Sequence, residues 1–402
     1  MANQLLTISM ITRESARVLV NNLGFAKKVN REYDDQFAVK GAKIGNTLNI
    51  RKPPRYIGRT GDALAIEDAT ETSVPLVLTT KFGVDLAFSM TDLVLSIENF
   101  SKRFIKPAIA KIANKIDFDG TLLYQSVYNT IGTPGTVPNQ ALTYLQVNQR
   151  LSEEAAPFED RNICITPAMN ATIVDALKGL FQAGDKIREQ YNKGMMGTGL
   201  GYDGWYLDQN LRTHTVGPLG GSPVVNGAGQ TGSSLITNGW TAAAANRLKK
   251  GDIFTVAGVN AVNPQNQQDT GALRQFVVTA DTSSDGAGNA TIPISPAITV
   301  SGPFQNVTAS PANAAAITVL GAASTKSPQG LAFHCDAFTL GMADLLLPRG
   351  VHAADRISDK QLGVSIRLVE AYDINLDRLP CRTDVLYGYA PVYPELACRL
   401  AS

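Results

Sequence analysis

The sequence has almost no net charge and no long apolar run, and each shortage removes a class of protein. Thirty-six Lys and Arg residues face 35 Asp and Glu residues, which leaves a formal charge of +1. There is no basic excess to drive nucleic-acid binding by counterion release. No run of about 18 uninterrupted apolar residues exists, so we expect no transmembrane helix and no membrane partner. The first residues lack a basic segment followed by an apolar run, so we expect no signal peptide.

Residues that build metal and catalytic sites are also scarce. The four cysteines form no CxxC pair, and their spacing fits no zinc or disulfide framework, so we expect free thiols that are buried or partly buried. The three histidines lie far apart, without ligand or triad spacing. Walker A, HExxH and GxSxG motifs are absent. We therefore expect no enzyme, no metal and no cofactor. The cysteines are Cys164, Cys335, Cys381 and Cys398, and the histidines are His214, His334 and His352.

One GxGxxG match occurs, at Gly199, Gly201 and Gly204. A dinucleotide-binding loop of this kind needs a strand before it and a helix that begins at it. The flanking sequences KGMMGT and WYLDQN fit neither requirement. We interpret the match as a flexible glycine loop.

The chain is long enough for two or three domains. Its 402 residues exceed the roughly 250–300 at which one hydrophobic core stops growing. The composition, 44% hydrophobic and 18% charged, is typical of a folded chain. Residues 4–23 have the apolar spacing of an amphipathic helix, and residues 27–40 indicate an extended arm.

A long β-hairpin is predicted next. Apolar and polar residues alternate over 44–52, and Pro53-Pro54 ends that strand. Alternation resumes over 74–78 and 82–88, and the tip over 55–72 holds few large apolar residues. A projecting hairpin cannot bury its own faces and is marginal alone. A neighbouring subunit is one candidate to cover it.

Helices and one α/β unit follow. An apolar stripe predicts a helix over 98–128, kinked or interrupted at Pro107. Asp117 and Asp119 point to different faces of that helix, so we interpret them as surface charges or intersubunit contacts. A second helix is predicted over 141–156. After it comes a strand around Ile163 and Ile165, then a helix that Thr166 caps and Pro167 begins.

The composition changes sharply over residues 217–325. This stretch holds eight charged residues and no Cys, His, Tyr or Glu, and it contains recurring short strand patterns such as IFTVAGV and RQFVVTA. We predict a small all-β barrel or sandwich. After Lys326 the composition again resembles that of the residues before 217. Residues 331–347 have the pattern of a strand and then of a helix, and apolar and polar residues alternate near Val364 and Val385. The β domain is therefore an insertion in an α+β fold.

The order of these parts resembles the major capsid proteins of tailed bacteriophages, which have the Hong Kong phage-type capsid fold. ITRESARVLVNNLGFAKKVNREYDDQF, GNTLNIRKPP and VDLAFSMTDLVLSIENFSKRFIKPAIAKIANKID are similar to the coat proteins of the short-tailed Salmonella phage family. NICITPAMNATIVDAL is similar as well, and LKKGDIFTVAGVNAVNPQ resembles the entry to that family's inserted telokin-like domain.

The resemblance implies a division of the chain and a function. The expected parts are an N-arm (1–43), an extended loop (44–80), a peripheral domain with its spine helix (81–157, helix 98–128), an axial domain in two parts (158–215 and 327–363), an inserted β domain (216–326) and C-terminal strands (364–402). In the family, many copies form hexamers and pentamers of an icosahedral shell around double-stranded DNA. Assembly in the host cytoplasm uses scaffolding and portal proteins, and the procapsid expands. We match no Lys–Asn crosslinking motif, so we expect a shell without crosslinks.

Seven charged residues are candidates for intersubunit contacts because they lie on the loop tip or in the spine-helix region. They are Arg55, Arg59, Asp62, Glu67, Asp68, Arg103 and Lys106. Three alternatives to the major capsid protein stay open. They are a bacterial nanocompartment shell protein of the same fold, a minor virion protein, and an enzyme with a β appendage.

Overall fold

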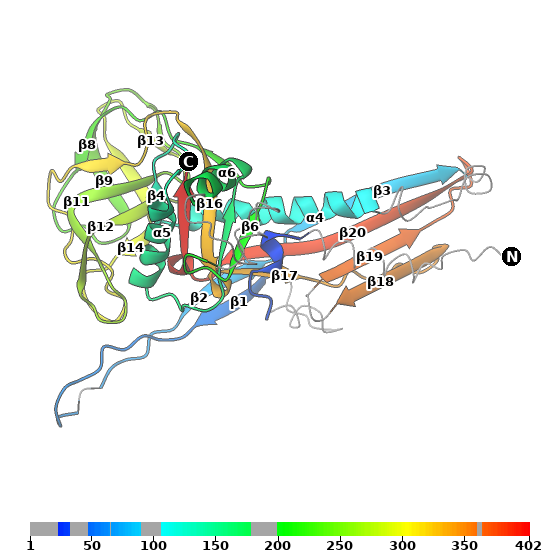
Figure 1. The fold of residues 1–402 in the computed structure, drawn as a ribbon, viewed down its shortest axis with the longest axis horizontal. Coiled ribbons are helices and arrows are strands. Elements are labelled where there is room, and N and C mark those ends of the chain that lie inside the picture. Colours follow the sequence, from blue (N-terminus) through cyan, green and yellow to red (C-terminus); the bar gives the residue numbers. More distant parts are fainter. Residues whose placement is uncertain (1–22, 33–46, 65, 90–105, 178–198, 360–363) are drawn as a thin grey trace. The chain divides into compact units, whose positions relative to one another are not determined.

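The computed structural model describes residues 23–32, 47–64, 66–89, 106–177, 199–359 and 364–402 (Figure 1). They form two compact units. The first is drawn from Met1–Ile50, Ser73–Gly120 and Phe338–Val392, and the second from Arg51–Thr72, Thr121–Ala337 and Tyr393–Ser402. Both units combine helix with sheet, so the predicted α+β class is confirmed. The predicted helix over 4–23 and most of the arm over 27–40 lie outside the described residues. No described helix is long and apolar enough to cross a membrane.

The first unit is built on one antiparallel sheet whose centre is β20. In β20, the residues from Arg378 to Tyr387 pair with the whole of β3, and parts of the strand also pair with β19 and with β17. The strands are β17 (Phe338–Met342), β20 (Arg378–Pro391), β19 (Val364–Glu370), β18 (Ala353–Asp359) and β3 (Thr80–Ser89).

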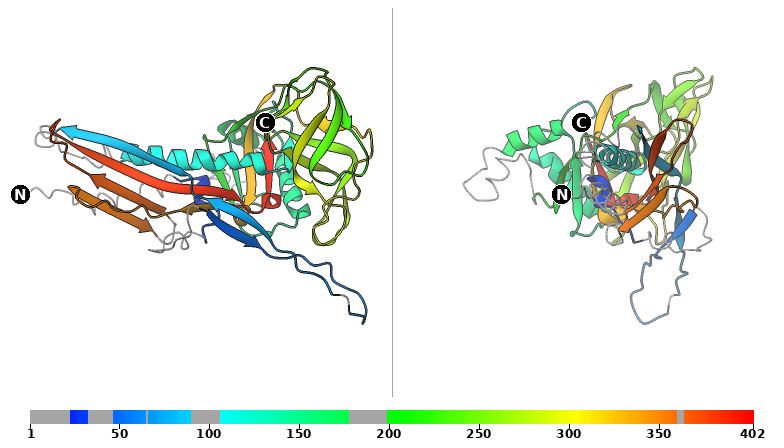
Figure 2. Two further views of the ribbon diagram at one scale, coloured as in Figure 1. Left: turned by 180° about the vertical axis from the view of Figure 1, so that it is seen from behind. Right: turned by 90° about the vertical axis from the view of Figure 1, so that its right-hand side faces the viewer.

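Helix α4 (Lys106–Gly120) covers one face of this sheet and runs along β3 and β20 (Figures 1 and 2). The Tyr387 hydroxyl donates to Asp119 Oδ2 at 2.8 Å, and the Tyr389 hydroxyl donates to the Ile116 carbonyl at 3.0 Å. Because strand side chains alternate between faces, Val385 shares this covered face with the two tyrosines. The alternate residues Asp384, Leu386 and Gly388 belong to the opposite face.

The α-helix is shorter than the predicted span of 98–128. Its predicted start, before Lys106, lies outside the described residues. It ends at Gly120, and residues Thr121–Ser126 form a 3-10 helix (η3). A Cβ on Gly120 would lie 2.7 Å from the Phe25 ring and 2.9 Å from the Tyr389 ring. Close packing thus selects a glycine, a poor helix former, and the prediction of α-helix over 121–128 is wrong.

Asp117 and Asp119 have partners within the chain. Asp117 is buried and accepts hydrogen bonds from the backbone N–H groups of Gly24, at 2.6 Å, and Ala26, at 2.9 Å. Asp119 accepts from Lys115 at 2.6 Å as well as from Tyr387. The interpretation of Asp117 as a surface charge or an intersubunit contact is therefore wrong.

The second unit has a six-stranded sheet packed against two helices. Its core joins residues of α5 (Ala141–Glu153), α6 (Pro167–Leu177) and the sheet, including Tyr144, Met169 and Trp205. The strands, in sheet order, are β4 (Thr130–Gly132), β21 (Ala397–Ala401), β16 (Lys326–His334), β5 (Arg161–Ile165) and β6 (Gly204–Leu207), with β7 (Thr213–Thr215) paired to β16.

Local sequence signals act here as predicted. Thr166 Oγ1 accepts a hydrogen bond from the backbone N–H of Met169 at 3.2 Å, and Pro167 is the first residue of α6. The buried Arg161 donates to the carbonyls of Ala156 and Pro157, both at 2.6 Å. This cation satisfies carbonyl groups just beyond the end of α5.

Residues 221–319 form the predicted all-β structure. Backbone bonds between Val225 and residues 314 and 315 join β8 to the segment before β15, so the sheet closes on itself as a barrel. Figure 2 shows these strands curving around one another. Their buried apolar side chains form a core cluster of their own. The strands, in sheet order, are β15 (Ile317–Val319), β11 (Ile253–Val262), β12 (Asp269–Val278), β14 (Ala290–Ile298), β9 (Gly232–Trp240) and β8 (Gly221–Val225), beside a pair of β10 (Ala245–Leu248) and β13 (Thr282–Ser284).

The chain enters and leaves this barrel at adjacent points. The Val216 N–H donates to the Thr325 carbonyl at 3.0 Å, next to the paired residues Thr215 and Lys326. Arg399, buried in β21, donates to the carbonyls of Val127, at 2.7 Å, and Gly251, at 2.8 Å, so it joins the barrel to the surrounding sheet. Burial lowers the pKa of Arg399 to about 10.

Two predicted elements differ from the structure. Residues 331–347 continue as β16, the 3-10 turn η5 (Cys335–Ala337) and β17, so the predicted helical character is wrong. The five residues of β17 pair with β20, and sheet pairing prevails over helix propensity. The strand predicted over 82–88 lies in β3 and joins the sheet of β20 rather than the hairpin.

Candidate intersubunit site

The loop between β1 (Thr47–Lys52) and β2 (Thr72–Val77) is the segment for which intersubunit contacts are predicted. The two strands pair, and the described residues between them, 53–64 and 66–71, form no strand (Figure 1). The loop divides by charge. Residues 51–59, the basic limb, carry four cations and no carboxylate, and residues 60–71, the acidic limb, carry four carboxylates and no cation.

Arg55 lies at the base of the loop and is half-buried. Its guanidinium is 3.2 Å from Glu395 Oε1 and lies 5.6 Å from the Phe304 ring centroid. Lys52 Nζ lies 4.7 Å from the centroid of the Tyr393 ring. Burial lowers the pKa of Lys52, and the charge of Glu395 opposes that shift. These contacts fix the base of the loop within the second unit.

Glu67 and Arg59 are bonded within the loop itself. Glu67 accepts hydrogen bonds from the backbone N–H groups of Ile57, at 2.8 Å, and Gly58, at 2.7 Å. Arg59 donates to the carbonyl of Gly61. The two side chains therefore hold the limbs together. A contact of Glu67 or Arg59 with another chain would have to share the side chain with these hydrogen bonds.

Asp62 and Asp68 are exposed at the far part of the loop. Neither carboxylate has an ion-pair partner among the described residues. Beside them, Leu64 is 80% exposed and Ile66 is 83% exposed. Large apolar side chains at such exposure, next to free carboxylates, are typical of a surface that another chain covers. Of the other two candidates, Arg103 lies outside the described residues, and Lys106 begins α4 with its side chain not described.

A cleft of about 820 Å³ lies at the base of the loop, within the second unit. Aromatic and proline side chains form much of its wall, among them Pro54, Tyr56, Tyr128, Phe304, Tyr393 and Pro394. The sequence analysis did not predict Lys52 and Glu395 as residues of this site. The position of Lys52 could have indicated it, because Lys52 ends a strand before two prolines. Glu395 could not be found in this way, because it reaches Arg55 from a distant part of the chain.

A buried ion pair also borders the cleft. Arg274 Nη1 on β12 lies 2.5 Å from Glu154 Oε1, at the end of α5, and the Arg274 guanidinium lies 4.6 Å from the Tyr128 ring centroid. Burial raises the pKa of Glu154, and the positive charge of Arg274 limits that rise. Because each charge is held by the other, the pair links the barrel to α5.

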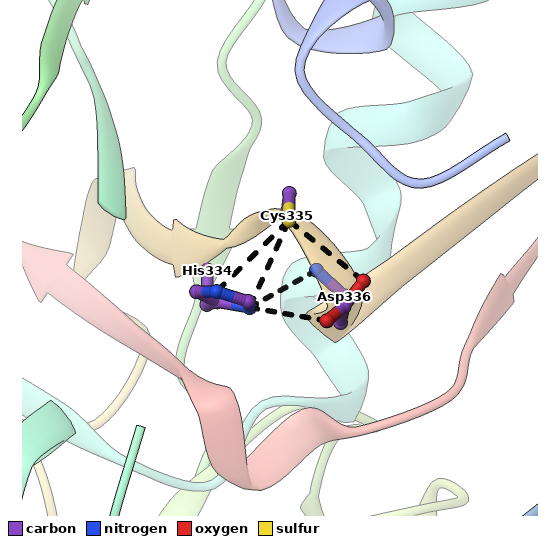
Figure 3. A group of neighbouring side chains, drawn as sticks. All are labelled: His334, Cys335 and Asp336. Atoms are coloured by element: carbon purple, nitrogen blue, oxygen red, sulfur yellow. Dashed lines mark hydrogen bonds and ion pairs between the residues drawn. The ribbon is translucent and has the colours of Figure 1, made fainter. Parts of the chain in front are cut away.

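His334, Cys335 and Asp336 form the one group of possible metal ligands among the described residues, with ligand atoms within 4.8 Å of one another (Figure 3). The three are consecutive in sequence, and a structural zinc site needs four ligands in tetrahedral order, with cysteine as thiolate. Burial and the neighbouring Asp336 raise the pKa of Cys335 to about 12, so the thiol keeps its proton at neutral pH. The group does not fit such a site.

The GxGxxG match is not a dinucleotide loop. Gly199 and Tyr202 form a β-bridge, and Gly204 begins strand β6 where a helix would be required. Tyr202 and Trp205 are buried in the core of the second unit. The segment therefore contributes side chains to the hydrophobic core of the second unit.

Comparisons with known proteins identify the family of the chain. The family model described as P22 coat protein, gene protein 5, matches residues 1–400. A chain of Mycobacterium phage Che8 is 13% identical, with 94% of this chain and 90% of that chain covered and a TM-score of 0.45. A chain of the mature capsid of bacteriophage PhiM1 is 10% identical, with 94% and 86% covered and a TM-score of 0.45. The CUS-3 coat protein I-domain is 31% identical over 25% of this chain and 95% of its own, with a TM-score of 0.19. No curated protein matches.

Proposed function

This chain belongs to the P22 coat protein family and is a tailed-phage major capsid protein that forms the virion shell, and we propose how its parts build that shell. Copies assemble as hexamers and pentamers in the host cytoplasm, around a scaffolding protein and beside a portal protein. The procapsid then takes up double-stranded DNA and expands. A net charge of +1 supports this proposal, because it limits repulsion between closely packed copies.

The loop over residues 53–71 carries the proposal at the level of residues. Leu64 and Ile66 are exposed beside Asp62 and Asp68, which have no ion-pair partner in the described part of the chain. In the shell, a neighbouring copy covers this surface. Arg55 positions the loop through Glu395, and Glu67 and Arg59 keep its two limbs together.

Electron microscopy of negatively stained protein tests the shell. The chain is expressed with and without the neighbouring phage genes. We expect closed round shells with them, and aberrant spirals or tubes without them. Particles of one to a few chains in both samples would contradict the proposal. DNA inside purified particles supports the phage shell, and an enclosed enzyme would support a nanocompartment.

A second variant tests the loop. Replacing residues 57–70 by a short turn should leave the subunit folded, because the base contact of Arg55 with Glu395 lies outside the deletion. We expect soluble subunits with native circular dichroism that no longer form shells. Normal shells from the deletion variant would refute the intersubunit role of the loop.

The absence of crosslinks is tested by boiling purified shells in denaturing detergent. We expect a single monomer band on electrophoresis, because Lys52 and Lys81 lie in no recognisable crosslinking motif. Covalent ladders in the presence of reductant would contradict this part of the proposal.

A further inference from the structure

The strand β4 lies at one end of the six-stranded sheet of the second unit. Among the described strands it pairs only with β21, in parallel, with Thr130 opposite Arg399. The free side of an end strand presents backbone groups that a strand of another chain can bind, so proteins usually cover or disrupt such an edge. The outer edge of β4 therefore needs a cover.

A side chain of the barrel bonds to the backbone of β4. The Thr130 N–H donates to Gln275 Oε1 at 2.7 Å, and Gln275 Nε2 donates to the Thr130 carbonyl at 3.0 Å. A residue of an antiparallel neighbouring strand would exchange the same two hydrogen bonds with Thr130. The carboxamide of Gln275 thus occupies the place of a pairing strand.

Glutamine is suited to this position because its side chain carries a carbonyl acceptor and an N–H donor in one plane. Glutamate would keep an acceptor and lose the donor, and methionine would lose both. Gln275 lies in the middle of β12, opposite Thr255 on β11, and reaches a backbone 145 residues earlier in the chain. The two hydrogen bonds therefore depend on the barrel being in place.

The surroundings of this contact are buried. Thr130 is 2% exposed, and Tyr128, two residues before it, packs with Ile253 and Val277 of the barrel. Val277 lies two residues after Gln275 and therefore shares its face of β12. Because water is excluded here, a backbone group of Thr130 that lost its partner would be left unsatisfied.

Other barrel contacts end on a helix rather than on a sheet edge. Arg274 pairs with Glu154 at the end of α5, and Asn263 Nδ2 donates to the Glu153 carbonyl at 2.8 Å. These contacts attach the barrel without satisfying a free strand. The contact of Gln275 differs from them, because the groups that it binds are those through which a sheet grows.

We propose that the barrel covers the β4 edge, with Gln275 at the pairing positions of Thr130, and thereby prevents an extended strand of a second copy from adding to the sheet. This goes beyond the proposed shell function, because it concerns an association that a protein present in many copies must avoid. The length of β4 acts in the same direction, since a strand of three residues offers a short edge.

Two matched variants separate covering the edge from attaching the barrel. Gln275→Glu loses the donor to the Thr130 carbonyl. Asn263→Asp is also an amide-to-acid change and loses the donor to the Glu153 carbonyl, while its remaining oxygen can still accept from the Gln265 N–H. Circular dichroism of the purified subunits confirms that each variant is folded. If Gln275→Glu does not fold, Gln275→Met, which adds no charge, takes its place.

Two measurements on subunits without scaffolding protein give the readout. Hydrogen exchange over residues 128–132 reports opening of the edge, and thioflavin T fluorescence with light scattering reports β pairing between subunits. We expect Gln275→Glu to raise both rates about tenfold, because the loss of one hydrogen bond to a buried carbonyl shifts the open population by about this factor. Asn263→Asp should behave as wild type does. Equal association of the two variants would overturn the proposal, because a loosened barrel would then be sufficient.

The associated protein shows where the subunits meet. In associated Gln275→Glu protein, residues 128–132 should again exchange slowly, because a second copy now pairs with the edge. Fast exchange there would place the contact elsewhere and overturn the proposal.

A rescue variant tests the edge itself. Thr133 is exposed and directly follows β4, and a lysine beside an edge strand hinders pairing with another chain. Gln275→Glu/Thr133→Lys should therefore associate more slowly than Gln275→Glu while remaining as unstable in urea unfolding. An unchanged rate of association would contradict an edge contact. None of these readouts requires shells, so a failure of the shell function is distinguishable from a failure of this inference.

Discussion

The Asp117 carboxylate lies 2.6 Å from the backbone nitrogen of Gly24 and thereby ties α4 to the segment that precedes the N-terminal 3-10 turn η1 (Phe25–Lys27). The other carboxylate oxygen accepts from Ala26 at 2.9 Å. Phe25 lies between the two donors in the sequence, and its ring centroid is 5.8 Å from the Phe338 ring centroid. One buried charge thus satisfies two backbone donors and positions an aromatic side chain in the core of the first unit.

Removing this carboxylate should destabilise the first unit. We expect Asp117→Ala to lower the free energy of unfolding by about 2–3 kcal/mol, because two buried N–H groups lose a charged acceptor. Urea unfolding, followed by circular dichroism, measures the change. Asp62→Ala, an exposed carboxylate without an ion-pair partner in the described chain, is the control and should unfold as wild type does. An Asp117→Ala variant as stable as the control would show that these hydrogen bonds contribute nothing.

Asp384 should make stability depend on acid pH. Burial alone would raise the pKa of Asp384, but the hydrogen bonds from Arg382 and Arg367 outweigh burial and lower it. Its contribution is therefore complete above the ordinary aspartate pKa of about 3.9 and disappears as pH falls through the lower folded-state value. Asp384→Asn should cost about 2–3 kcal/mol at pH 7. The difference between variant and wild type should shrink in urea unfolding as the pH falls from 5 to 2. A difference that stays constant over this range would contradict the assignment.

Sequence patterns predicted the elements that interactions between neighbouring residues stabilise. They missed the elements that depend on residues distant in the sequence. Thr166 and Pro167 began a helix as expected, because capping involves neighbours in the chain. Phe338, Leu340 and Met342 formed a strand against expectation, because their partner strand lies some 50 residues on, at Tyr387–Pro391. The same holds at the candidate site.

Within that site, the loop and its charges could be read from the sequence, but their partners within the chain could not. Arg55 is predicted as an intersubunit contact, and the structure shows a partner in the same chain, Glu395, which no spacing indicates. Asp384 shows the same limit. Its significance comes from Arg367 and Lys81 on two other strands, and the glycine at position 83 becomes meaningful only when Asp384 lies against it.

The Glu154–Arg274 pair should couple the barrel to α5. Arg274→Met leaves Glu154 buried without its counterion, and we expect a loss of about 3–5 kcal/mol in unfolding free energy. The double variant Glu154→Gln/Arg274→Met should lose less, because no unpaired charge remains. Urea unfolding of the three proteins measures both values. Arg51→Gln, in an exposed ion pair with Glu71, is the control and should change little. Equal losses in the single and double variants would contradict an ionic coupling.

Deleting residues 217–325 tests whether the barrel is an insertion that supports the rest of the chain. Since Val216 and Thr325 are hydrogen-bonded and Thr215 pairs with Lys326, a short Gly-Ser linker can close the gap without moving β7 or β16. The remaining chain should therefore still form its sheet. Arg399 would lose its bond to the Gly251 carbonyl, however, and a buried guanidinium would be exposed. We expect a several-fold lower soluble yield and few normal particles, measured by fractionation and electron microscopy. Wild-type yield with normal shells would show that the barrel supports neither folding nor assembly.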